Sequence, residues 1–244
     1  MRKALAAVLL MVPVCAMAQP DPVATLSPLK VSNVRIGGGA CSGSTVIYDT
    51  THASTQGAEI TAAANGPATS MADRIVLAGT DRFVCEISVD LFTLNDNSPF
   101  NATMTLFTDC TTNGAGNTPC GNGPGVLIAG STSTLTGIQA PALGTIFTVV
   151  FSFSPPVNLG AEVDNTISVR INSSRNNTFW RLNETPTVGS IPTGEPATSF
   201  VERCGSTAAN NGCQRNFGVN NNFAMQIMAM TTPVELMDWS VDGR

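Results

Sequence analysis

Charged side chains are scarce in this chain of 244 residues. They make up 12% of the sequence, about half of the usual share, and Lys3 and Lys30 are its only lysines. The formal net charge is −5. Neutralising phosphates or an anionic membrane needs clustered Lys and Arg, and no such cluster occurs in the sequence. We therefore expect no nucleic-acid partner and no membrane binding through a basic amphipathic helix.

Histidine and aromatic residues are also scarce. His52 is the only histidine, which excludes a catalytic zinc ion held by two or three histidines. Aromatic residues are 6% of the chain, so few rings are present to stack on a sugar. A triad of His52 with Asp49 and a serine stays open, although a histidine in a polar loop is usually solvated.

Two pairs of acidic residues are the remaining candidates for acid–base chemistry. Glu86 and Asp90 fall on one face of an expected strand, whereas Glu162 and Asp164 share an expected turn. A glycosidase places such a pair across a sugar-binding cleft. We interpret both pairs as solvated side chains, which leaves no catalytic residue assigned.

Long apolar runs are missing except at the start of the chain. Arg2 and Lys3 precede the apolar segment 4–14, and the small residues Ala16 and Ala18 flank Met17. This pattern predicts a signal peptide over residues 1–18, cleaved between Ala18 and Gln19. The segment is too short for a permanent membrane helix. We expect a secreted, extracellular protein, with the periplasm, the cell surface and a lipidated Cys15 as alternatives.

The cysteines favour disulfides. Of seven in the chain, removal of Cys15 leaves six, which permit 15 full pairings. Short turn-rich segments separate Cys110 from Cys120 and Cys204 from Cys213, so we expect these two bridges. By elimination, a third and long-range bridge is expected between Cys41 and Cys85. A zinc site is the alternative, but C-x2-C spacing is absent. Cys41 also lies in a G-x-C-x-G string, Gly39–Gly43, that lacks the strand and helix of a nucleophile elbow.

Hydrophobic residues alternate with a period of two along most of the chain. In the segment 83–91 the odd positions are apolar, and Cys85 is one of them. Glu86, Ser88 and Asp90 fall on the other face, so the segment is predicted to be a half-buried antiparallel strand. Further strands are expected at 44–48, 74–77, 101–108, 126–129, 145–153, 166–171, 179–182, 223–230 and 234–241. No sustained helical pattern occurs.

This pattern predicts an all-β protein, an antiparallel β-sandwich of jelly-roll type stapled by disulfides. A single closed sheet is the alternative architecture. The expected organisation is a signal peptide over 1–18, an amino-terminal segment over 19–57 that leads into the sandwich, the sandwich over 58–231, and a carboxy-terminal strand or tail over 232–244.

Several motifs resemble those of bacterial secreted or surface domains. Asp73–Arg82 fits D-x-I-x-L-A-G-T-x-R. Gly123–Ile128 resembles G-x-P-G-x-x-I/L and matches its P-G-x-x-I/L part; Trp180–Leu182 and Pro186–Ser190 match later parts of the pattern. The chain resembles the β-sandwich domains of choice-of-anchor and PEP-CTERM-type proteins over about 58–230. The resemblance implies the fold but no catalytic residues. Residues 232–241 resemble the strand before a sorting signal, without the apolar helix that would follow, so we expect no transmembrane anchor.

Two kinds of ligand site are considered, a calcium site and a carbohydrate platform. Calcium is the one cofactor considered, through the oxygens of Asn95, Asp96, Asn97 and Asn101 or of Asp109, Asn113 and Asn117. Trp180 and Trp239 could stack on a carbohydrate, but a buried core position is more usual. The sequence therefore predicts a non-enzymatic module with a structural or adhesive role, with surface glycans or matrix proteins as partners. The alternative is a carbohydrate-binding domain or a glycoside or ester hydrolase; the oligomeric state is left open.

Overall fold

The computed structural model describes residues 23–26, 30–39, 41–51, 55–60, 70–108, 126–160, 165–183, 185–192, 199–201, 213–215 and 222–231. These residues form strands, turns and bends and no helix. No segment of this described part is an apolar helix of membrane-spanning length. The strands are β1 (Val23–Thr25), β2 (Lys30–Gly37), β3 (Thr45–Asp49), β4 (Gln56–Glu59), β5 (Ser70–Val76), β6 (Phe83–Thr93), β7 (Phe100–Thr108), β8 (Leu127–Ile138), β9 (Thr145–Asn158), β10 (Thr166–Ser173), β11 (Thr178–Asn183), β12 (Ser199–Val201), β13 (Cys213–Arg215), β14 (Asn222–Phe223) and β15 (Met225–Met230).

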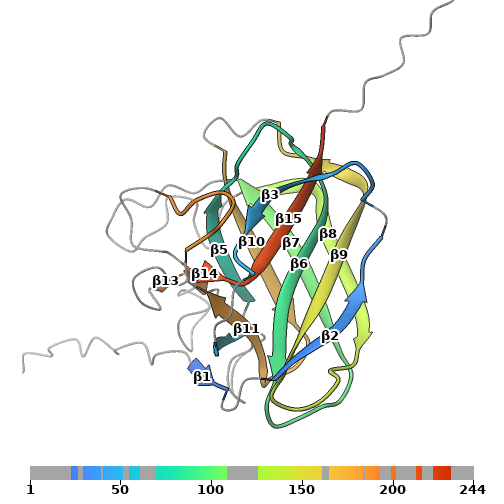
Figure 1. The fold of residues 1–244 in the computed structure, drawn as a ribbon, viewed down its shortest axis with the longest axis vertical. Helices are drawn as coiled ribbons and strands as arrows, with labels where there is room; N and C mark the ends of the chain where they lie inside the picture. The colour runs from blue at the N-terminus through green and yellow to red at the C-terminus, as the bar shows by residue number, and fades with distance from the viewer. Residues whose placement is uncertain are drawn as a thin grey trace, which may run out of the picture.

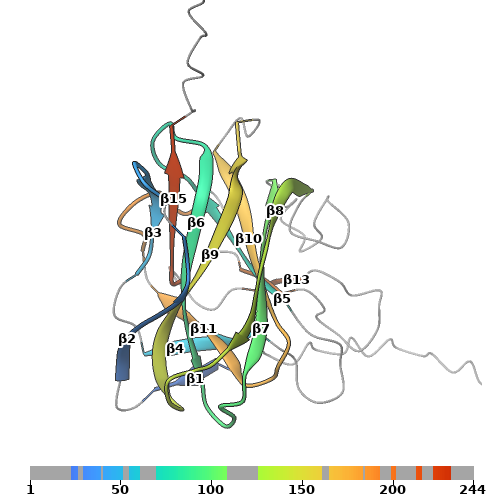
Figure 2. The same cartoon turned by 90° about the vertical axis from the view of Figure 1, so that its right-hand side faces the viewer.

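The strands form two sheets that pack face to face (Figure 2). The larger sheet has nine strands, with the order β1-β4-β11-β6-β15-β3; β9 and then β2 extend it beyond β6, and β14 pairs with β11. The smaller sheet has six strands in the order β13-β12-β5-β10-β7-β8. Every pair is antiparallel except β2 with β9. The predicted all-β antiparallel sandwich is confirmed, whereas the jelly-roll connectivity stays a prediction.

The core lies between the two sheets and follows the alternation of their strands. Ile87, Val89 and Leu91 of β6 belong to the same buried cluster as Val169 and Ile171 of β10. Because successive side chains of a strand point to opposite faces, every second residue of each central strand enters this layer.

The strand β6 differs from its predicted pattern. Its register with β9 shifts between Val84 and Glu86, a β-bulge that reverses the alternation. Val84 therefore joins the core cluster, and Cys85 does not. The prediction of a half-buried strand was wrong, because Glu86 and Ser88 on the outer face are buried as well.

Other segments close the two open sides of the sandwich. On one side, residues 187–190 bridge the edges of the sheets: Asp49 N donates to Val188 O at 3.0 Å, and Val76 N donates to Ser190 O at 2.9 Å. Gly189 has φ +81°, and a Cβ atom there would lie 2.6 Å from Val76 O, so only glycine fits. On the other side, Ser133 Oγ of β8 donates to Ser152 O of β9 at 2.9 Å.

Four strands of the larger sheet begin in the segment 19–57, which was expected to lead into the sandwich, and the fourth of them, β4, starts at Gln56. β1, β2 and β3 all lie before residue 50 and pair within that sheet. β2 was not expected as a strand because it is an edge strand with mostly exposed side chains and hence no apolar alternation. Figure 1 shows β2, the strand that carries Arg35, at the edge of the sheet beside β9.

Candidate functional site

A depression of about 290 Å³ lies on the outer face of the larger sheet. Its lining residues come from β2, from the glycine run that follows it, from β6 and from β9: Arg35, Gly37, Gly38, Gly39, Glu86 and Val150. The chain leaves β2 at one edge and reaches β3 at the other, so it has to cross the face of β9, β6 and β15 (Figure 1). The depression forms where this crossing begins.

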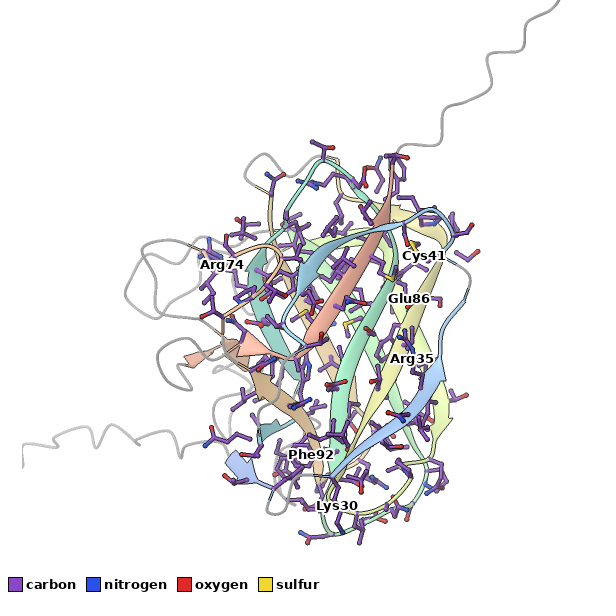
Figure 3. The ribbon with its side chains drawn as sticks, in the orientation of Figure 1. Lys30, Arg35, Cys41, Arg74, Glu86 and Phe92 are labelled. Atoms are coloured by element: carbon purple, nitrogen blue, oxygen red, sulfur yellow. A yellow bond between two sulfur atoms is a disulfide. The ribbon has the colours of Figure 1, made fainter. Side chains whose placement is uncertain are left out.

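Glu86 is the acidic group of the depression, and Arg35 is the basic one. The side chain of Glu86 is 9% exposed, whereas that of Arg35 is 57% exposed. Arg35 Nη2 donates to Glu86 Oε1 at 3.1 Å. In Figure 3 the two labelled residues lie next to each other on the same side of the sheet. A buried carboxylate is thus covered by a cation that solvent reaches.

The crossing chain lies close to the sheet, and its backbone conformation requires glycine at the first two of the three positions. A Cβ atom at Gly37 would lie 2.4 Å from Val150 O, and Gly37 and Gly38 have φ of +86° and +97°. L-residues with side chains rarely adopt this conformation. A Cβ atom at Gly38 would lie 3.8 Å from Glu86 Oε2, and one at Gly39 would lie 3.2 Å from Ser152 Oγ. The absence of side chains therefore leaves the space above Glu86 open.

A disulfide holds the crossing chain on the sheet. Cys41 bonds Cys85, with their Cα atoms 5.8 Å apart, and Cys85 precedes Glu86 in β6. The predicted Cys41–Cys85 bridge is therefore confirmed. The cysteine of the G-x-C-x-G string, Cys41, is part of this disulfide. Cys110, Cys120 and Cys204 lie outside the described residues, and only the backbone of Cys213 is described, so the other two bridges stay predictions.

A second ion pair lies on the same face. Asp90 follows Glu86 by four residues on β6, and its Oδ2 accepts from Arg181 Nη1 at 2.9 Å. Thr148 Oγ1 of β9 donates to Asp90 Oδ1 at 3.0 Å. Glu86 and Asp90 share a face as expected, but the interpretation of that face as solvated was wrong, since β2 and β11 each place an arginine over it.

A third acidic side chain points into the core. Asp73 of β5 is fully buried, in the same alternating phase as Met71 and Ile75. Its Oδ2 accepts from Phe223 N at 3.0 Å, and its Oδ1 has no hydrogen-bond partner among the described residues. Burial raises the pKa of Asp73 to about 7, although hydrogen bonds from the backbone of Phe223 and Arg74 oppose this rise.

Tyr48 of β3 lies close enough to this carboxyl group to respond to its charge. Burial, and then the negative charges of Asp73 and Asp49, raise the pKa of Tyr48 well above its ordinary value. The Tyr48 hydroxyl has no hydrogen-bond partner in the described part of the chain. Sequence reasoning missed this pair, although the signal was present: Asp73 occupies an apolar-phase position between Met71 and Ile75.

The resemblance motif Asp73–Arg82 has a structural explanation. Asp73 at its start binds the backbone of β14, as described above. Arg82 at its end donates to Gly79 O at 2.9 Å, to Asp81 O at 2.7 Å and to Asn165 Oδ1. The motif therefore stabilises the turn between β5 and β6 and its contact with the chain before β10.

Trp180 is part of the core and offers no surface to a ligand. Its exposed fraction is 0%, its Nε1 donates to Ala224 O at 3.0 Å, and its ring stacks on that of Phe223 with centroids 4.3 Å apart. The interpretation as a buried tryptophan is confirmed. Trp239 lies outside the described residues, as do His52, Glu162 and Asp164.

The oxygens considered for calcium are partly engaged in turn hydrogen bonds. Asp96 Oδ1 accepts from Ser98 N at 2.7 Å and lies 3.7 Å from Arg175 Nη1. Hydrogen bonds from the Ser98 hydroxyl and from the Ser98 backbone N–H lower the pKa of Asp96. Asn101 Oδ1 accepts from Gly137 N at 3.0 Å. Calcium at this loop stays a prediction, and the second candidate set, Asp109, Asn113 and Asn117, lies outside the described residues.

Comparison with known proteins returned no matching family model, curated sequence or solved structure. The function must therefore be inferred from the residues of the site: a buried glutamate, an exposed arginine and a glycine run that a disulfide fastens to the sheet.

Proposed function

We propose that this chain is an exported, non-enzymatic β-sandwich module with a structural or adhesive role outside the cell or at its surface. The observation that carries this proposal is the state of three of the described residues considered for catalysis. Cys41 is bonded to Cys85, Glu86 is paired with Arg35, and Asp90 is paired with Arg181. Each is engaged in a bond that supports the fold, and a cysteine in a disulfide cannot act as a nucleophile.

The proposal includes export and membership of the bacterial surface-domain type named above. A disulfide persists in an oxidising compartment, which supports export. The low charge and the many hydroxyl and amide side chains suit a protein that works by contact with polar surfaces. Intact mass of the exported protein should correspond to a chain that begins at Gln19; a mass that corresponds to a lipidated Cys15 would contradict this part.

The functional part is tested with the full exported protein. We expect it to bind the surface of its source cells or their extracellular matrix in a saturable manner. We also expect no turnover on a panel of glycosides, polysaccharides and esters. Turnover that Glu86→Gln or Asp90→Asn abolishes, in a variant with unchanged circular dichroism, would replace the proposal with the hydrolase alternative.

A further inference from the structure

We propose that the depression between Arg35 and Glu86 binds a pair of adjacent hydroxyl groups of a neutral saccharide. This inference rests on the proposed function, because it names the ligand class through which the module would make its contacts. Four features of the site lead to it: its charge, its hydrogen-bonding groups, its size and its rigidity.

The charges of the depression favour a neutral ligand. Arg35 and Glu86 carry opposite charges 3.1 Å apart, and the other lining residues are glycines and Val150. An anion bound to Arg35 would lie beside the buried carboxylate, and a cation bound to Glu86 would lie beside the guanidinium. Lys30, the other cationic residue of β2, is at the opposite end of the strand (Figure 3). Neither sign of ligand charge is therefore favoured.

The hydrogen-bonding groups suit hydroxyls. The guanidinium has five N–H donors, of which the structure shows one bonded to Glu86 Oε1. The second oxygen of Glu86 lies on the side of Gly38, a residue without a side chain, where a Cβ atom would be 3.8 Å away. A carboxylate accepts from two neighbouring O–H groups, and the arginine donates to the oxygens of the same groups. A vicinal diol offers both functions in one rigid unit.

A further polar group lies beneath the glycine run. Ser152 of β9 is the cross-strand partner of Glu86, and its Oγ is buried without a hydrogen-bond partner among the described residues. It would lie 3.2 Å from a Cβ atom at Gly39. A buried hydroxyl normally has a partner. A ligand hydroxyl that enters beside Gly39 would provide one.

The size and rigidity of the depression fit a single sugar unit. Its volume of about 290 Å³ is near the lower end of the range for small-molecule pockets, roughly 300–1,000 Å³. The Cys41–Cys85 bridge fixes the glycine run before binding, so less conformational entropy is lost when the ligand binds.

The test uses the full exported protein on an array of neutral glucan, mannan and galactan oligosaccharides, printed beside uronic-acid and amino-sugar oligosaccharides. We expect binding to at least one neutral series and weaker binding to the charged ones. For the strongest neutral oligosaccharide, Arg35→Gln and Glu86→Gln should each weaken binding by about tenfold or more, because each removes a charge-assisted hydrogen bond. Lys30→Gln is the matched control: it removes one positive charge from the same strand and should change binding less than about twofold.

Each outcome decides between the two proposals. If the protein binds cells or matrix while no neutral oligosaccharide binds, or while Arg35→Gln and Glu86→Gln bind normally, the ligand inference is wrong and the proposed function stands. A preference for charged oligosaccharides also overturns the inference. If the protein binds neither cells, matrix nor the array, both proposals fail. Circular dichroism of each variant separates lost binding from lost folding, and Arg35, being largely exposed, provides a variant that should fold normally.

Discussion

The buried carboxyl group of Asp73 should make the stability of this protein depend on pH. The side chain is fully buried and points into the core, where one of its oxygens accepts from Phe223 N. Its pKa is about 7 in the folded chain and 3.8 in the reference state. Below about pH 4 the group is protonated in both states, so it adds no penalty. Above that pH the unfolded chain loses the proton first, and stability falls as the pH rises to about 7.

The size of this effect follows from the difference in pKa. One pKa unit corresponds to about 1.4 kcal/mol, so the fold loses about 4 kcal/mol between pH 4 and pH 8 from this group. Asp73→Asn keeps an acceptor for Phe223 N and removes the ionisation. The free energy of unfolding of the variant, relative to that of the normal protein, should therefore rise by about 4 kcal/mol over the same interval.

Urea unfolding at several pH values, followed by the fluorescence of the buried Trp180, measures this difference directly. Asp96→Asn is a control with the same chemical change. Hydrogen bonds from Ser98 lower the pKa of Asp96, so its contribution is present at neutral pH and is lost only on acidification. If Asp73→Asn and the normal protein differ by an amount that stays constant within about 1 kcal/mol from pH 4 to pH 8, Asp73 is not the buried acid described here.

Three further changes test other parts of the fold. Arg181→Met leaves the largely buried Asp90 carboxylate without the guanidinium that pairs with it. The free energy of unfolding in urea titrations should therefore fall by about 3 kcal/mol, and a fall of less than about 1 kcal/mol would contradict this. Replacing Cys41 and Cys85 by serine removes a bond between residues 44 positions apart. In the chain-entropy model this should lower the free energy of unfolding by about 4 kcal/mol, measured by urea unfolding under non-reducing conditions; unchanged stability would contradict it. Tyr48→Phe removes a buried hydroxyl without a hydrogen-bond partner among the described residues and should leave the melting temperature unchanged or higher, whereas a clear decrease would show that the hydroxyl is bonded.

The alternation of apolar residues was enough to predict the fold class and several inward-facing side chains. The expected strand at 179–182 places Trp180 and Leu182 on the same face, and both belong to the core cluster. Cysteine spacing likewise left Cys41–Cys85, which the structure contains. The strand predictions succeeded because side-chain direction along a strand is a local property with a period of two.

Whether the second face of a strand is covered is decided by segments far away in the sequence, which alternation does not report. Glu86 and Asp90 read as solvated from their own strand, yet Arg35 from β2 and Arg181 from β11 cover them. The bulge at Val84–Glu86 likewise depends on pairing with β9.

The depression and the buried acid were also decided by the tertiary structure alone. The sequence by itself determined that this chain forms paired strands with an apolar layer between sheets. The connection from β2 to β3 has to cross the sheet because these strands lie on opposite sides of β6, and that crossing brings three glycines over Glu86. The pKa of Asp73 is raised because the packed core buries its side chain, next to Phe223 of β14. Both features depend on which strands become neighbours, and strand order is a long-range property of the packed chain.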